Sequence, residues 1–202
     1  MFIAISLLVS YLIGAINFSF LYGKLVRGID IREHGSGNAG ATNTLRVLGK
    51  GPGIMVLVLD VLKGVAAVAV GDWAASPQQG WVPVACGLLA IVGHNWPVYF
   101  GFRGGKGVAT TIGAMAMLAF VPTLIACAIA VAAIAISRFV SLGSLLIVLA
   151  LPVLLLIMHR PPEIFWASVV LCLFVFIRHR SNIVKLWNGK ENKLGAKKRQ
   201  SS

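Results

Sequence analysis

Glycines, asparagines and one arginine interrupt an otherwise apolar sequence at residues 34–51, HGSGNAGATNTLRVLGKG. Glycine lets backbone N–H groups turn toward a ligand without obstruction by a Cβ atom. A helix that begins near Ala41, with Ser or Asn as its cap, offers its N-terminus to an anion. A flexible linker is the alternative, but linkers seldom place two asparagines and an arginine among their glycines. We therefore predict an anion-binding loop whose candidate residues are Gly35, Ser36, Gly37, Asn38, Asn43 and Arg46.

A second glycine-rich stretch lies at residues 93–111, GHNWPVYFGFRGGKGVATT. A lysine beside a glycine turn at the start of a helix suits a phosphate. The spacing does not fit a Walker loop, since Gly107 stands where that motif has Ser or Thr and no strand precedes it. An ordinary basic loop is the alternative interpretation. The predicted phosphate ligands are Gly104, Gly105, Lys106 and Gly107.

A third polar stretch, IRHRSNIVKLW, covers residues 177–187. His179 and Asn182 are three apart and share a helical face, and histidine exchanges a proton near neutral pH. We interpret this pair as functional and the flanking arginines as an ordinary basic helix end. Ser141 lies near the turn at Arg138 and is a candidate donor to an anion; for this residue we weigh a functional and a structural role equally.

We interpret the remaining ionisable and thiol side chains of the apolar segments as structural. Asp60 and Lys63 lie one helical turn apart in an apolar segment; ionisable residues there often mark function, but an internal ion pair is the interpretation that we favour. Cys86, Cys127 and Cys172 form no metal-binding spacing and read as small buried side chains. We expect chemistry with no metal and no cofactor.

The elements that position these residues read as membrane helices. Hydrophobic residues make up 58% of the 202 residues and charged residues 12%, against about a quarter charged in soluble domains. One apolar segment, 108–137, is too long for a single crossing, and Pro122 divides it into two short spans. The sequence thus predicts an all-α protein with seven transmembrane helices in the segments 1–23, 53–71, 81–100, 108–137 (two spans), 141–158 and 163–180.

Charge determines the predicted orientation. With the N-terminus outside, every lysine and arginine except Arg160 and Lys63 faces the cytoplasm, which agrees with the positive-inside rule. The formal charge of +12 is therefore assigned to topology and not to nucleic-acid binding. We expect a retained first span, a membrane domain at 1–187 and a basic cytoplasmic tail at 188–202.

The predicted topology brings the three polar motifs to one face, where water meets lipid. Such a site suits a soluble phosphate compound that meets an apolar chain. A transporter for an organic phosphate is the alternative, but transporters bind near the midplane between related halves, and no repeat is visible. A membrane scaffold has no need of three anion-suited motifs.

The order and spacing of GSGNAGATNTLRVLG, GHNWPVYFGFRGGKGVAT and RHRSNIVKL closely resemble the bacterial PlsY-type acyl-phosphate:glycerol-3-phosphate acyltransferases. The resemblance covers nearly the whole chain, with LDVLKG and SRFVSL as further matches. It implies a seven-helix enzyme of the bacterial cytoplasmic (inner) membrane, with acyl-phosphate as donor and sn-glycerol 3-phosphate as acceptor. The implied products are 1-acyl-glycerol 3-phosphate (lysophosphatidic acid) and phosphate. Arg103 stands where the family commonly has a lysine, which keeps the charge.

The resemblance also gives roles to the candidate residues. Ser36, Lys106 and nearby glycine N–H groups are expected to hold acyl-phosphate, and Asn182 to orient the acceptor hydroxyl. Glycerol 3-phosphate would be held by Arg46, Lys106, Ser141 and His179. The base is either His179 or the substrate phosphate, and no histidine has the Asp five residues later that an H-x-x-x-x-D pair needs. The expected partners are these substrates and membrane lipid, and a transient contact with the enzyme that produces acyl-phosphate stays open.

Overall fold

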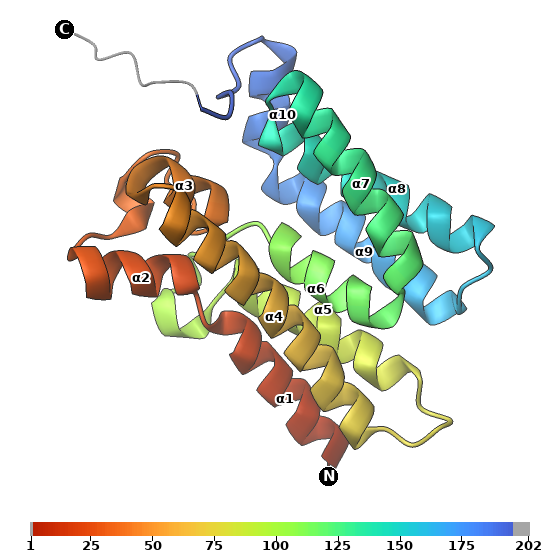
Figure 1. Ribbon diagram of the computed structural model, residues 1–202. Helices are drawn as coiled ribbons and strands as arrows, with labels where there is room; N and C mark the ends of the chain where they lie inside the picture. Colours follow the sequence, from red (N-terminus) through yellow and green to blue (C-terminus); the bar gives the residue numbers. More distant parts are fainter. Residues whose placement is uncertain (1, 196–202) are drawn as a thin grey trace, which may run out of the picture.

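The computed structural model describes residues 2–195 and folds this part of the chain into helices, with no strand in that range (Figure 1). The all-α prediction is therefore confirmed for the described residues. The α-helices are α1 (Phe2–Ala15), α2 (Phe18–Arg27), α3 (Ala41–Leu48), α4 (Lys50–Ala74), α5 (Trp81–Asn95), α6 (Val108–Leu118), α7 (Phe120–Ser137), α8 (Val140–Ile157), α9 (Pro162–Arg178) and α10 (Arg180–Trp187); two 3-10 turns are η1 (Ile31–Glu33) and η2 (Val98–Phe100).

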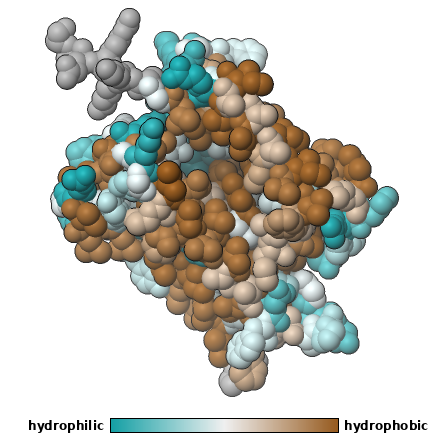
Figure 2. Space-filling model, viewed as in Figure 1, coloured by the Kyte–Doolittle hydropathy of each residue, from teal (hydrophilic) through white to brown (hydrophobic). Residues whose placement is uncertain are grey.

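Several helices are long and apolar enough to cross a bilayer. Four segments pass by length and composition, namely α4, α5 together with η2 (Trp81–Phe100), α7 and α8, and the bent pairs α1–α2 and α9–α10 raise the number to six. The remaining apolar helix, α6, has only 11 residues. Large apolar side chains cover much of the surface seen in Figure 2, as lipid-facing helices require. The protein is a multi-pass membrane protein, while seven crossings and their orientation stay a prediction.

The long apolar segment 108–137 is broken at a different place from the one predicted. The break falls at Ala119, whose backbone is extended between α6 and α7. Pro122 lies in the first turn of α7, where a missing N–H removes no intrahelical bond. Because α7 continues for 18 residues, only α6 is short, and the expectation of two short spans around Pro122 is wrong.

The first apolar segment, predicted to run through residues 1–23, is also broken. Asn17 ends the run of α1 and caps α2, since its side-chain oxygen accepts from the N–H of Phe20 at 2.9 Å. Its side-chain nitrogen donates to the carbonyl of Ala39 at 3.2 Å. Asn17, at the 45° bend between α1 and α2, therefore connects the end of the first helix to the loop that carries Ser36.

Small residues let the helices approach closely. A Cβ atom on Gly14 would lie 2.0 Å from the carbonyl oxygen of Ala90, and one on Gly113 would lie 1.9 Å from that of Val61. Because these positions are glycines, α1 packs closely against α5 and α4 packs closely against α6, as in membrane helix pairs generally. In Figure 1, α1 and α4–α6 form one group and α7–α9 another, while α2, α3 and α10 gather at one end of the molecule. Figure 2 shows a hollow between the two groups near that end.

Candidate active site

The first glycine-rich loop is shaped from within by Asn43. Its side-chain oxygen accepts from the N–H and the hydroxyl of Ser36 at 2.8 and 3.1 Å. Its nitrogen donates to the carbonyls of Ile31 and His34 at 3.1 and 2.9 Å. The amide is thereby fully used inside the protein, so Asn43 holds the loop, and its predicted contact with substrate stays a prediction. Gly35 is required here, because its φ is +65° and a Cβ would lie 2.3 Å from the Asn43 oxygen.

The helix after this loop starts where the sequence predicts. α3 begins at Ala41, but its N-cap is Gly40, with no side-chain cap. The expected Ser or Asn cap is therefore wrong. Asn43 reaches back to the loop in place of a cap, and Ser19 of α2 shares a hydrogen bond of 2.7 Å with Thr44.

The glycine–lysine loop is held against the end of α5. The N–H groups of Gly104 and Gly105 donate to the carbonyls of Asn95 and His94 at 3.3 and 3.1 Å. These two amides, and that of Gly37, which donates to His34, are occupied within the protein. The glycines at these positions permit close packing of the loops, and ligand binding by glycine N–H groups stays a prediction.

Arg178 fastens the same loop from α9. Its guanidinium donates to the carbonyl of Gly105 at 2.7 Å and to that of Gly104 at 3.2 Å, and it lies 5.6 Å from the centre of the Trp96 ring. The sequence interpretation, an ordinary basic helix end, missed this role. Gly107, with a φ of +82°, is the N-cap of α6, so the helix start predicted after it is confirmed.

The Lys106 side chain leaves the loop toward α10. Its ammonium donates to the side-chain oxygen of Asn182, and the Asn182 nitrogen donates to both carboxylate oxygens of Glu191 at 3.1 and 3.0 Å. Burial lowers the pKa of Lys106 to about 8, while Glu191 acts in the opposite direction. Lys106 and Asn182, both predicted for the site, are thus in direct contact.

His179 occupies the 65° bend between α9 and α10. Its Nδ1 lies 2.9 Å from the carbonyl oxygen of Val175. Because a carbonyl only accepts, Nδ1 carries the hydrogen, and in the neutral ring Nε2 is left as an acceptor. His179 and Asn182 line the same cavity, although His179 lies at the break between α9 and α10 and the two residues do not share one continuous helix, as their spacing predicted.

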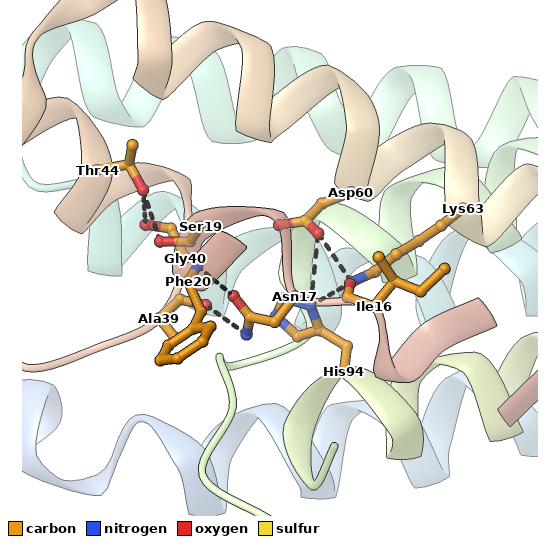
Figure 3. A network of polar contacts seen from close by, with 10 residues as sticks. All are labelled: Ile16, Asn17, Ser19, Phe20, Ala39, Gly40, Thr44, Asp60, Lys63 and His94. Atoms are coloured by element: carbon orange, nitrogen blue, oxygen red, sulfur yellow. Dashed lines mark hydrogen bonds and ion pairs between the residues drawn. The ribbon is translucent and has the colours of Figure 1, made fainter. Parts of the chain in front are cut away.

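A buried ionic cluster lies behind the glycine–lysine loop (Figure 3). The ammonium of Lys63 is 2.8 Å from the Asp60 carboxylate and 2.9 Å from Nδ1 of His94, and it donates to the carbonyl of Ile16 at 2.8 Å. The predicted internal ion pair is therefore confirmed, and it ties α4 to α5 and to the end of α1. A Cβ on Gly105 would lie 2.1 Å from Nε2 of His94, so the loop rests on this cluster.

Two cavities meet between these elements. A polar cavity of about 320 Å³ is lined by both loops and by α10, with Arg32, Arg103 and Arg178 in its wall. A second cavity of about 420 Å³ continues between α4, α6, α7 and α8, where its wall is mainly apolar. The residues shared by both walls are Ser36, Asn38, Lys106, Asn182 and Lys185. Three of the four predicted catalytic residues therefore lie where a polar space joins an apolar one.

The other predicted residues are divided between these cavities. Gly37 and Gly104 line the polar one, whereas Arg46, Asn43, Gly107, Ser141 and His179 line the apolar one. The buried Ser141 hydroxyl has no hydrogen-bond partner within residues 2–195. Gly35 and Gly105 line neither wall and shape the loops from behind. Glu191, which also lines the second cavity, was not predicted, because in the sequence it lies within the basic tail.

Comparison with known proteins identifies the family to which this chain belongs. Residues 4–189 match the family model described as glycerol-3-phosphate acyltransferase. The glycerol-3-phosphate acyltransferases of Halalkalibacterium halodurans and Shouchella clausii are each 50% identical to this chain; the alignments cover 94% of both proteins for the first, and 95% of this chain and 96% of the relative for the second.

Two solved structures are similar in fold. They are crystal structures of PlsY, an integral membrane glycerol 3-phosphate acyltransferase, in its glycerol 3-phosphate and lysophosphatidic acid forms. Each is 35% identical to this chain, with TM-scores of 0.89 and 0.85. The matches cover 96% of this chain in both cases, and 96% and 95% of the solved chains. The chain therefore belongs to the glycerol-3-phosphate acyltransferase family, and it is a membrane acyltransferase.

Proposed function

We propose that this protein transfers an acyl chain from acyl-phosphate to sn-glycerol 3-phosphate at the cytoplasmic face of the bacterial inner membrane. The products are 1-acyl-glycerol 3-phosphate and inorganic phosphate. The observation that carries the proposal is the junction of a cationic cavity with an apolar one at Ser36, Lys106 and Asn182. In this proposal the phosphate of the donor lies in the first cavity, its acyl chain extends along the apolar part of the second, and the acyl carbonyl lies between them; the second cavity also has room for the acceptor beside its polar residues.

The reaction needs positioned groups more than a strong enzymic nucleophile. The 1-hydroxyl oxygen of glycerol 3-phosphate attacks the acyl carbonyl carbon, and the bond from that carbon to the phosphate oxygen breaks. Phosphate leaves with the electron pair. The hydroxyl proton passes to Nε2 of His179 or to a phosphate oxygen of a substrate. Preorganised donors near the carbonyl and the phosphates lower the barrier by stabilising the developing charge.

Each candidate residue has a place in this scheme. Ser36 and Lys106 hold the acyl-phosphate at the junction of the cavities, and Asn182 orients the acceptor hydroxyl. Arg46, His179 and the unpartnered hydroxyl of Ser141 line the cavity wall where the glycerol 3-phosphate would bind. The acyl chain extends between α4, α6, α7 and α8.

The identity of the acyl donor is tested by supplying three different donors in separate assays. Purified protein in a lipid mesophase receives glycerol 3-phosphate with palmitoyl-phosphate, palmitoyl-CoA or palmitoyl-acyl-carrier protein, and phosphate and lysophosphatidate are measured. We expect both products from palmitoyl-phosphate alone. Lysophosphatidate formed from palmitoyl-CoA at an equal rate would refute the proposed donor while leaving an acyltransferase.

A further inference from the structure

Glu191 is an acidic residue outside the three polar motifs that nevertheless contacts one of their residues, Asn182. The chain has six Asp and Glu residues, and among them only Glu191 and Asp60 line the two cavities. Asp60 is paired with Lys63. Glu191 is 8% exposed, which is unusual for a carboxylate unless it has partners.

The partners of Glu191 form a chain of contacts that leads to Lys106. Both carboxylate oxygens accept from the side-chain nitrogen of Asn182, and the Asn182 oxygen accepts from the Lys106 ammonium. An amide donates only through its nitrogen and accepts only through its oxygen. The carboxylate therefore fixes the orientation of the amide, and that orientation presents an acceptor to Lys106.

The segment after α10 is anchored at both ends, which holds Glu191 in place. At one end, the N–H of Lys190 donates to the carbonyl of Lys185 at 2.7 Å. At the other, Leu194 donates its N–H to the carbonyl of Arg138 at 2.7 Å and accepts from the Arg138 guanidinium at 2.8 Å. Arg138 lies in the turn between α7 and α8, so the segment joins α10 to the other side of the apolar cavity.

The charges around Lys106 give Glu191 a second effect. Apart from the carboxylate, the groups that face this ammonium are cationic or titratable, namely Arg46 of α3, Arg178 of α9, His179 at the bend and Lys185 of α10. Burial and the cations favour the neutral amine, whereas a carboxylate favours the ammonium. Glu191 thus opposes the loss of the proton from Lys106.

We propose that Glu191 is a positioning residue that acts through Asn182 to direct the Lys106 ammonium toward the junction of the two cavities and to keep it charged. This inference rests on the proposed function, because Lys106 is expected to hold the acyl-phosphate there. The competing role is that of a blocking anion, in which the carboxylate occupies the place of a substrate phosphate and leaves when the substrate binds.

The test compares pH profiles of kcat/KM for wild type, Glu191→Gln, Glu191→Asp and the matched control Glu163→Gln. Glu163 is an exposed carboxylate in the first turn of α9, at the end of that helix that lies away from Arg178 and the site. Loss of one nearby opposite charge shifts a pKa by about one unit. For Glu191→Gln we therefore expect the pKa of Lys106 to fall and the alkaline limb of the kcat/KM profile to move to lower pH. Its kcat/KM at pH 8.5 falls about sixfold further than at pH 6.5. Glu191→Asp restores the limb toward wild type, and Glu163→Gln leaves it unchanged.

The outcomes separate this inference from the proposed function. A wild type that makes no lysophosphatidate from palmitoyl-phosphate refutes the proposed function. An active wild type with an unmoved limb in Glu191→Gln refutes the positioning role, and a lower KM for glycerol 3-phosphate with that unmoved limb identifies a blocking anion. Glu191→Ala is the second variant if the glutamine variant does not fold, as judged by its elution in detergent. We expect the same displaced limb and a lower kcat at every pH.

Discussion

At the scale of single residues, the site depends on a few side chains whose hydrogen-bonding capacity is already assigned. Asn43 uses its amide to shape the first loop, whereas Lys106 and Asn182 form the wall where the two cavities meet. The hydroxyl of Ser141 stays unpartnered among the described residues. Buried polar groups are normally satisfied, so the free hydroxyl is where we expect an acceptor from a substrate.

Removal of the groups at the cavity junction is expected to abolish most turnover. Loss of one preorganised donor typically reduces kcat by about 10²–10³, and we expect losses of that size for Lys106→Ala and Ser36→Ala. The measurement is phosphate release from palmitoyl-phosphate in the lipid mesophase. The controls Lys24→Ala and Ser76→Ala change exposed residues outside both cavities and should retain wild-type rates. Comparable rates in the junction variants and the controls would contradict the assignment.

The same lysine predicts an alkaline limit to activity. The pKa of Lys106 is lowered to about 8, so the ammonium that we propose binds phosphate is present below that pH and is lost as the pH rises through it. We expect kcat/KM to fall above pH 8 and the fall to disappear in Lys106→Arg, because a guanidinium stays protonated. A pH series from 6.5 to 9.5 measures both. An arginine variant that keeps the same decline would show that another group titrates.

At the scale of elements, the glycine–lysine loop is positioned by the structures behind it. The end of α5 supplies two carbonyls, α9 supplies Arg178, and the cluster of Asp60, Lys63 and His94 supports the loop from within. The loop glycines therefore serve packing as much as ligand binding, and their replacement should act through geometry.

Gly105→Ala tests this packing. A Cβ there would lie 2.1 Å from Nε2 of His94 and 2.8 Å from the carbonyl oxygen of Ala39, so the loop must shift. Overpacking typically costs about 1–3 kcal/mol, and a displaced Lys106 should lower kcat by roughly 10². The control is Gly51→Ala in α4, where a Cβ meets nothing within 4 Å. Thermal unfolding and kcat are measured together, and equal values for the two variants would argue against a packed loop.

At the scale of the whole molecule, the bends and breaks collect every polar motif at one end. α2 turns away from α1, α10 turns away from α9, and the segment after α10 returns to the turn between α7 and α8. The substrates of the proposed reaction would enter at that end, where the polar cavity meets the apolar one and where Figure 2 shows a hollow.

The predicted topology is tested by single cysteines in a cysteine-free background. Exposed positions at the two ends are Arg103 and Lys190 near the site, and Ser76 and Arg160 in the loops after α4 and α8. In intact cells, an impermeant maleimide should label cysteines at the second pair only, and cell lysis should expose the first pair. Labelling of 103 and 190 from opposite sides would refute both the orientation and the shared site.

Sequence patterns predicted the local features of this protein well. The starts of α3 at Ala41 and of α6 after Gly107 agree with the glycine patterns, and His179 and Asn182 line one cavity although a helix break separates them. The patterns failed at Asn17 and Pro122. An asparagine inside an apolar run looked like one more residue of a span, and a proline was taken as a helix break although the first turn of a helix tolerates it.

The sequence by itself determined the helical membrane class and the identity of the polar motifs, because hydropathy and glycine spacing are local properties of the chain. Only the tertiary structure decided which groups are free to act. It uses the amides of Gly104 and Gly105 and the side chain of Asn43 inside the protein, and it brings Glu191 back to Asn182. Those contacts depend on how the bent helices pack and on where the segment after α10 returns to the bundle. Residue spacing along the sequence does not determine which distant residues come into contact.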